Sequence, residues 1–185
     1  MPEVDAAFVA LNAEDGSYRA MVGGFDFSRN QFNHVTSAWR QPGSSIKPFV
    51  YSAALEKGFS PATLMNDAPL SLPGGKGGQP WEPRNDDGFD GPISLRQALA
   101  RSKNVVAVRL LQAISPQYAR DYLQRFGFDA AKHPANLTMV LGSGSVTPLQ
   151  MAGAYAVFAN GGFTVTPRLV QKITDARGNV LWEAP

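Results

Sequence analysis

The feature that most constrains the fold is an apolar pattern of helical spacing in the middle of the chain. A four-residue capping box opens it, in which Ser94 and Gln97 satisfy the first backbone N–H groups of a helix. The following apolar positions recur with a period of 3.6 residues: Leu95, Ala98, Leu99, Val105, Val106, Leu110 and Ala113. Two helical segments are therefore expected here, and Ser102, on the same stripe, is predicted to face inward.

Three further helices are predicted on either side of this pattern. Residues 47–57 are helical in pattern and stop at Gly58, which suits a helix end. Ser-Pro opens a helix over 115–126, and Thr-Pro opens another over 147–160. The middle of the chain is therefore expected to form a mostly helical lobe.

Strand patterns occupy the two ends of the chain. Residues 5–12 and 17–22 flank a Glu-Asp-Gly turn, and residues 163–174 and 179–182 flank a second turn signal. The segment 60–91 holds five prolines and a glycine run, so we expect a long loop there. The order of elements predicts an α/β (α+β) domain with antiparallel hairpins packed on helices.

Composition excludes several classes of protein. A hydrophobic content of 44% with 17% charged residues is typical of a globular domain, and 185 residues suit one such domain. The net charge of +2 is small and scattered, which argues against a nucleic-acid partner. The chain has no cysteine, so it forms neither disulfides nor thiolate metal sites. Its longest apolar run, 151–159, is far shorter than the ~20 residues of a membrane-spanning helix.

Two short motifs carry the functional information. Ser44 and Lys47 are three residues apart at the start of a helix, where positions i and i+3 share one face. A lysine in a desolvated pocket can lose its proton and act as the base that activates a serine. Only Ser44, and not the adjacent Ser45, has this spacing. The second motif is Ser-Lys-Asn at 102–104.

The sequence around these motifs resembles one family. Residues 40–49 (RQPGSSIKPF) resemble the active-serine segment of class A penicillin-binding proteins, the bifunctional peptidoglycan synthases. Residues 98–104 (ALARSKN) resemble their second motif, and residues 141–152 (LGSGSVTPLQMA) with 156–162 (AVFANGG) resemble a third segment. The resemblance extends from about Val4 to the end of the chain.

The resemblance implies a serine D,D-transpeptidase with the penicillin-binding and serine β-lactamase-like fold. Ser44 would be the nucleophile, Lys47 its base, and Ser102 and Asn104 the second motif. Its partners would be peptidoglycan stem peptides ending in D-Ala-D-Ala, and β-lactam antibiotics would acylate it. No metal or organic cofactor is needed. The parent protein would lie at the periplasmic face of the inner membrane.

The same resemblance suggests that the chain is part of a larger protein. The sequence contains no Lys-Thr-Gly triplet, the third element of this enzyme class. We therefore expect a partial transpeptidase domain, with strands and loop in 1–43, the helical lobe in 44–162 and a hairpin in 163–185. A glycosyltransferase domain, a membrane anchor and the C-terminal strands of the domain are expected to be absent, and the isolated chain is expected to be impaired.

Two other functions fit the motifs. A serine β-lactamase shares them but needs a base for the deacylating water, and Glu82 is the one candidate in the right interval. A non-catalytic β-lactam sensor or partner-binding domain would use the loop 60–91 as its surface. An adduct that turns over in seconds favours the first alternative, and binding of a partner that is unchanged by Ser44→Ala favours the second.

The remaining polar residues have ordinary interpretations. His34 and His133 lack second ligands at metal spacing. The acidic residues of the long loop, Glu82, Asp86, Asp87 and Asp90, lack the pattern of a calcium loop and are expected to be solvated. Gly142-Ser143-Gly144 is expected to form a tight turn at the rim of the site. The aromatic residues Trp39, Trp81 and Phe89 could line a peptide groove or pack in the core.

Overall fold

The computed structural model describes residues 4–74 and 76–184, and the chain divides into two compact units. The first unit contains the chain up to Arg40, Arg125–Phe128 and the chain from Val146 onward. The second contains Gln41–Gln124 and Asp129–Ser145. Among the described residues the strands form three separate two-stranded antiparallel sheets, and the fold class is α/β, as predicted.

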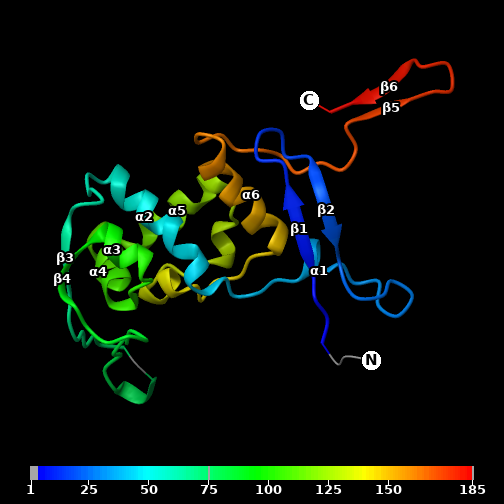
Figure 1. Ribbon diagram of the computed structural model, residues 1–185. Coiled ribbons are helices and arrows are strands. Elements are labelled where there is room, and N and C mark those ends of the chain that lie inside the picture. Colours follow the sequence, from blue (N-terminus) through cyan, green and yellow to red (C-terminus); the bar gives the residue numbers. More distant parts are fainter. Residues whose placement is uncertain (1–3, 75, 185) are drawn as a thin grey trace. The chain divides into compact units, whose positions relative to one another are not determined.

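The first unit is built on the N-terminal hairpin. Strand β1 (Phe8–Leu11) pairs with β2 (Tyr18–Val22), with a register shift at Ala10/Leu11, and helix α6 (Pro148–Ala159) packs on β1 (Figure 1). A capping box of Thr147 and Gln150 opens α6. The short helix α1 (His34–Ser37), which was not predicted, also contacts α6. The predicted hairpin and helix are confirmed.

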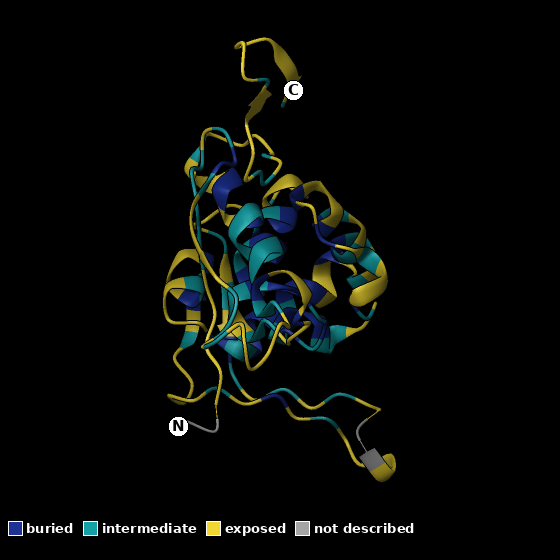
Figure 2. Cartoon of the chain, turned by 90° about the vertical axis from the view of Figure 1, so that its right-hand side faces the viewer, coloured by how far each residue is buried: buried dark blue, intermediate teal, exposed yellow. Residues whose placement is uncertain are grey.

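The C-terminal hairpin is also confirmed, although its first strand is short. Strand β5 (Lys172–Thr174) pairs with β6 (Val180–Glu183), and every residue of both strands is exposed (Figure 2). The prediction of a strand from residue 163 was wrong. The backbone of Arg168 instead bonds across the first hairpin, donating to Gly16 O and accepting from Tyr18 N–H.

Packed helices form the core of the second unit. Helices α2 (Lys47–Glu56), α4 (Asn104–Ile114) and α5 (Pro116–Leu123) contact one another, and the 3₁₀ helix η5 (Leu137–Leu141) packs on α4. Their inner faces are buried (Figure 2). Fully buried side chains of α2 and α4 include Phe49, Val50, Val106 and Leu110. Burying such a side chain contributes about 1.5–3 kcal/mol.

The ends of the helices follow the predicted signals. The capping box of Ser94 and Gln97 opens α3 (Leu95–Ala100), and α2 ends just before Gly58, which has φ +93°. Helix α5 continues through the 3₁₀ helix η3 (Gln124–Phe126) to Gly127. A further 3₁₀ helix, η4 (Ala130–Lys132), was not predicted.

The prediction of an irregular loop over 60–91 was partly wrong. Strand β3 (Leu64–Asp67) pairs in regular antiparallel register with β4 (Gly91–Ser94), and η2 (Lys76–Gly78) lies between them. The β3 sequence, LMND, has no alternation of apolar and polar residues. Its pairing depends on a partner 24 or more residues away, which a local pattern does not reveal. No helix within 4–74 and 76–184 has the length and apolar character needed to cross a bilayer.

Candidate functional site

Ser44 lies in a 3₁₀ turn that runs directly into helix α2. The turn, η1 (Gly43–Ile46), is continuous with α2, and the Lys47 N–H donates to Ser44 O. This bond places Ser44 and Lys47 on one face, as their spacing predicted. The Ser44 residue is exposed, and the structure gives its hydroxyl no hydrogen bond to any described residue.

The neighbouring Ser45 is in a different state. Its hydroxyl donates to Pro42 O over 2.6 Å, and the residue is half-buried. A hydroxyl committed to a local carbonyl is a poor candidate for attack on a substrate. The two adjacent serines therefore differ in their hydrogen bonds: the Ser45 hydroxyl is engaged by Pro42 O, whereas the Ser44 hydroxyl bonds none of the described residues.

The Gly142 turn packs against the turn that carries the serine. Gly142 has φ +79°, and a Cβ at this position would overlap the backbone N and O of Gly43. Only glycine allows this close approach of two backbones. The predicted tight turn at 142–144 is thus found next to Ser44, within the second unit, where it supports η1 from one side.

Lys47 is the buried centre of the site. The residue is 1% exposed, and its Nζ lies 2.7 Å from Ser102 O, 3.0 Å from Ser102 Oγ and 2.7 Å from Asn104 Oδ1. These three bonds use all the N–H groups of an ammonium. A neutral amine keeps two N–H groups and gains a lone pair, so deprotonation frees one of the three directions to accept a proton.

The environment of Lys47 favours that deprotonation. Burial lowers the pKa of Lys47 from 10.5 to about 8, against the opposing effect of the Asp86 carboxylate. Roughly one molecule in ten then carries a neutral Lys47 at pH 7. A base with a pKa near the working pH can both hold and release a proton.

Ser102 does not face inward, which corrects the prediction from the apolar stripe. Helix α3 ends before it in a Schellman motif, in which Lys103 N–H donates to Ala98 O and Ser102 N–H donates to Leu99 O. Ser102 has φ +54° and is exposed. Glycine normally fills this left-handed position because a side chain there costs about 1 kcal/mol. The break between α3 and α4 therefore turns the serine to the surface.

Asn104 begins helix α4 and bonds on both sides of its amide. Its Oδ1 accepts from Lys47 Nζ, and its Nδ2 donates to Arg84 O over 2.9 Å. The two sequence motifs, 55 to 57 residues apart, thus meet at one ammonium group. The other Ser-x-Asn copy, at 28–30, lies in the first unit, where the Ser28 hydroxyl bonds Asp26.

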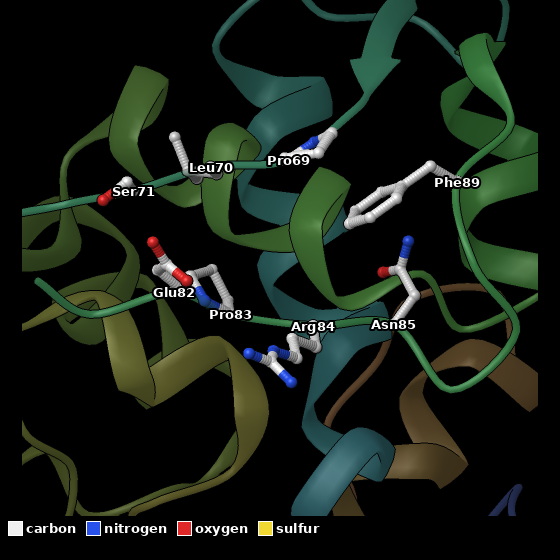
Figure 3. Close-up of a pocket in the computed structure, with 8 residues that line it drawn as sticks. All are labelled: Pro69, Leu70, Ser71, Glu82, Pro83, Arg84, Asn85 and Phe89. Atoms are coloured by element: carbon white, nitrogen blue, oxygen red, sulfur yellow. The ribbon is translucent and has the colours of Figure 1, made fainter.

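A pocket of about 450 Å³ adjoins Asn104 through the segment that carries Arg84. Figure 3 shows its walls: the extended segment 69–71 on one side, Glu82 to Asn85 on the other, and the Phe89 ring beside Asn85. Phe89 is 46% exposed and lines this pocket, and Trp81 lines a second pocket with Leu72. Two of the three aromatic groove candidates therefore line cavities of the second unit.

Trp39 belongs to the first unit and is 42% exposed, so it is not a core residue. Of the histidines, His34 Nδ1 bonds Gly23 O over 2.8 Å, while His133 is buried. Among the described residues no group of three or more histidine or acidic side chains is arranged to hold a metal ion.

The acidic loop is not simply solvated, contrary to the prediction. Asp87 and Asp90 both form ion pairs with Lys103, which is fully buried, and with Arg101. The sequence predicted no role for Lys103 beyond its place in the Ser-Lys-Asn motif. Glu82 is exposed in the pocket wall, and within the described residues its carboxylate bonds none of the four motif side chains.

This geometry coincides with a sequence match. Residues 6–184 match the penicillin binding protein transpeptidase domain. The chain belongs to this family. It is 51% identical over 181 residues to penicillin-binding protein 1A of Neisseria flavescens and 48% identical over 185 residues to that of Escherichia coli strain K12. These alignments cover 97% and 100% of this chain but only 23% and 22% of the relatives.

Solved structures of the family have the same fold. The crystal structure of penicillin-binding protein 1A from Haemophilus influenzae matches 99% of this chain and 27% of its own, with a TM-score of 0.92 and 43% identity. The PonA1 protein of Mycobacterium tuberculosis in complex with penicillin V matches 96% of this chain and 49% of its own, with a TM-score of 0.82 and 30% identity. The predicted class A resemblance and transpeptidase fold are confirmed.

The lowered pKa of Lys47 predicts how the rate of acylation by penicillin depends on pH. If neutral Lys47 accepts the serine proton, the acylation rate of the chain should rise ~10-fold between about pH 7 and about pH 9 and then level off. Intact-mass measurement of the adduct over time gives the rate. Lys47→Arg, which stays protonated, should be slow at every pH. A flat profile in the unmodified chain would contradict the role of Lys47 as base.

The strained backbone of Ser102 leads to a second prediction. Ser102→Gly relieves the left-handed strain, so the free energy of unfolding should stay equal or rise by up to about 1 kcal/mol. If the Ser102 hydroxyl relays a proton to the leaving group, its loss should lower the acylation rate by about 10²-fold. Urea denaturation and adduct formation measure the two effects. A variant that is acylated at the unmodified rate would exclude the relay role.

Proposed function

We propose that the chain carries the acylation machinery of a serine D,D-transpeptidase that crosslinks peptidoglycan stem peptides. The observation that carries the proposal is the buried Lys47 ammonium. It is bonded to Ser102 and Asn104 and lies one 3₁₀ turn after the exposed Ser44. A lowered lysine pKa beside an uncommitted serine hydroxyl is the arrangement that acyl transfer requires.

In the proposed reaction the Ser44 Oγ attacks the carbonyl carbon of the D-Ala-D-Ala peptide bond, and its proton passes to Lys47 Nζ. The C–N bond then breaks as the Ser102 hydroxyl gives its proton to the leaving amine and takes up the proton held by Lys47 Nζ, which lies 3.0 Å from Ser102 Oγ. The product is an acyl ester on Ser44. A second stem-peptide amine attacks this ester, forms the crosslink and restores the serine hydroxyl.

Two backbone and side-chain groups suit the remaining tasks. Ser44 is the second residue of its 3₁₀ turn, where the first intrahelical bond runs from Ser45 N–H to Pro42 O, so the Ser44 N–H precedes the ladder. We assign it one half of the oxyanion hole. Asn104 is assigned to hold a substrate amide. Stem peptides lie outside the cytoplasmic membrane, so we place the site on its outer face.

Covalent labelling tests the nucleophile. Ser44→Ala should abolish the formation of a penicillin adduct, since it removes the hydroxyl of the proposed nucleophile. Ser45→Ala is the matched control and should be acylated at close to the unmodified rate, because the Ser45 hydroxyl donates to the local carbonyl Pro42 O. Fluorescent penicillin and gel detection are sufficient. Undiminished labelling of Ser44→Ala would refute the proposal.

The lifetime of the adduct separates the transpeptidase from a hydrolase. A β-lactamase needs a general base that activates the hydrolytic water. Glu82 is exposed, and among the described residues its carboxylate forms no hydrogen bond with Lys47. We expect the adduct to last many minutes, and Glu82→Gln to leave that lifetime unchanged. Release within seconds that Glu82→Gln slows would favour hydrolysis.

The isolated chain should be slow for a reason visible in its sequence. The 185 residues contain no Lys-Thr-Gly, and we propose that the second oxyanion donor comes with that element. Loss of one such donor costs about 10²–10³ in rate. Exchanging the chain for the matching segment of the full-length Escherichia coli relative should raise the labelling rate at least ~100-fold. Rapid stoichiometric labelling of the isolated chain would contradict this.

A further inference from the structure

Lys103 is buried beneath the second motif, among carboxylates. Its side chain is 0% exposed, and Nζ lies 2.7 Å from Asp87 Oδ1, 2.7 Å from Asp90 Oδ2 and 3.2 Å from Asp67 Oδ2. It also donates to Gly88 O over 3.1 Å. Although burial opposes the charge, the bonds to the three carboxylates raise the pKa of Lys103. The ammonium therefore stays charged and joins strand β3 to the loop 84–90.

Asn85 links this cluster to helix α4. Its Nδ2 donates to Asp67 Oδ1 and to Gly88 O, each over 2.7 Å. Its Oδ1 accepts from Asn104 N–H over 2.9 Å and from Val105 N–H over 3.0 Å. Both amide donors and the amide oxygen are thus in use, and the oxygen caps α4 from another segment of the chain.

The two residues on either side of Lys103 are those that bond Lys47. Ser102 precedes it in the left-handed position and Asn104 follows it at the start of α4. The side-chain amide of Asn104 donates from Nδ2 to Arg84 O, and its backbone N–H donates to Asn85 Oδ1. Hydrogen bonds from the loop 84–90 therefore fix the second motif on the side away from Lys47.

We infer that Lys103 and Asn85 are positioning residues for the proposed acyl transfer: the Lys103–Asp67–Asp87–Asp90 cluster, through Asn85, holds Ser102 and Asn104 in reach of Lys47. This inference rests on the proposed function for its effect on rate. Its structural half, that the cluster holds the start of α4, stands without it.

Arg101 lies outside the cluster but pairs with two of its carboxylates, and it therefore offers a matched control. Its guanidinium pairs with Asp87 and Asp90 at 2.9 and 2.6 Å, but its side chain is 49% exposed. Solvent-exposed ion pairs contribute little, so Arg101→Met should change the acylation rate by less than about 5-fold. Lys103→Met removes the buried cation that joins all three carboxylates, and Asn85→Ala removes the link without changing any charge.

The test measures penicillin acylation, thermal unfolding and amide hydrogen exchange on the same variants of the 185-residue chain. A displacement of about 1 Å at a reacting group can cost about 10²-fold in rate. Lys103→Met and Asn85→Ala should therefore lose about that factor at temperatures well below their melting points. The Asn104 and Val105 amides should exchange faster, while amides in the core of α5 stay protected.

A second control separates positioning from general stability. Ile114→Ala opens a cavity at the far end of α4, where Ile114 is 3% exposed, and should lower the melting temperature while keeping the acylation rate. If Asn85→Ala folds, keeps its Asn104 and Val105 protection and is acylated at the unmodified rate, the inference is overturned. If the unmodified chain is not acylated at all, the proposed function fails. Hydrogen exchange at the Asn104 and Val105 amides then still shows whether Lys103 and Asn85 hold the start of α4.

Discussion

The candidate site depends on one buried ammonium group. Lys47 starts helix α2, and its Nζ is bonded by two groups of Ser102 and by Asn104, which belong to the junction of α3 and α4. A charge without solvent is costly unless it is paired or lost. Among the described residues no carboxylate is hydrogen-bonded to Lys47, and burial lowers its pKa to about 8. The same lack of solvent that makes a buried charge costly favours the neutral amine, which is the form that the proposed base requires.

The second unit contains two buried lysines, Lys47 and Lys103, in opposite electrostatic environments. Lys103 is paired with three carboxylates and stays charged, while Lys47 donates its hydrogen bonds to neutral oxygens of Ser102 and Asn104. Lys103 therefore keeps its charge and its ion pairs near neutral pH, whereas Lys47 can gain or lose a proton there. Lys103 lies between Ser102 and Asn104 in the sequence, and both of these neighbours accept hydrogen bonds from Lys47. The motif therefore connects the two environments directly.

Local signals in the sequence predicted much of the fold. The capping box at Ser94, the Thr-Pro pair at 147–148 and the glycines at 58 and 127 mark helix ends, because each satisfies or ends a backbone hydrogen-bond ladder. The spacing of Ser44 and Lys47 likewise needs only one helical turn to place both residues on one face. Turn chemistry and helical period act over a few residues, so a single sequence records them.

Long-range features could not be predicted in this way. Strand β3 pairs with β4 across the proline-rich segment, and the acidic loop gains its order from Lys103, which lies 13 to 36 residues away from its carboxylate partners. The outward turn of Ser102 was missed because a periodic pattern assumes an unbroken helix, and the Schellman motif here has serine where glycine would have signalled the break.

The pKa of Lys47 is the measurement that tests this account most directly. The chain has six lysines, so ¹³C-lysine NMR resolves each ε-carbon, and the Lys47→Arg spectrum assigns the signal of interest. We predict a titration midpoint for Lys47 near 8, with Lys103 still protonated well above that pH. A Lys47 midpoint near the ordinary value of 10.5 would mean that the ammonium is solvated and cannot serve as the base, and would contradict the account.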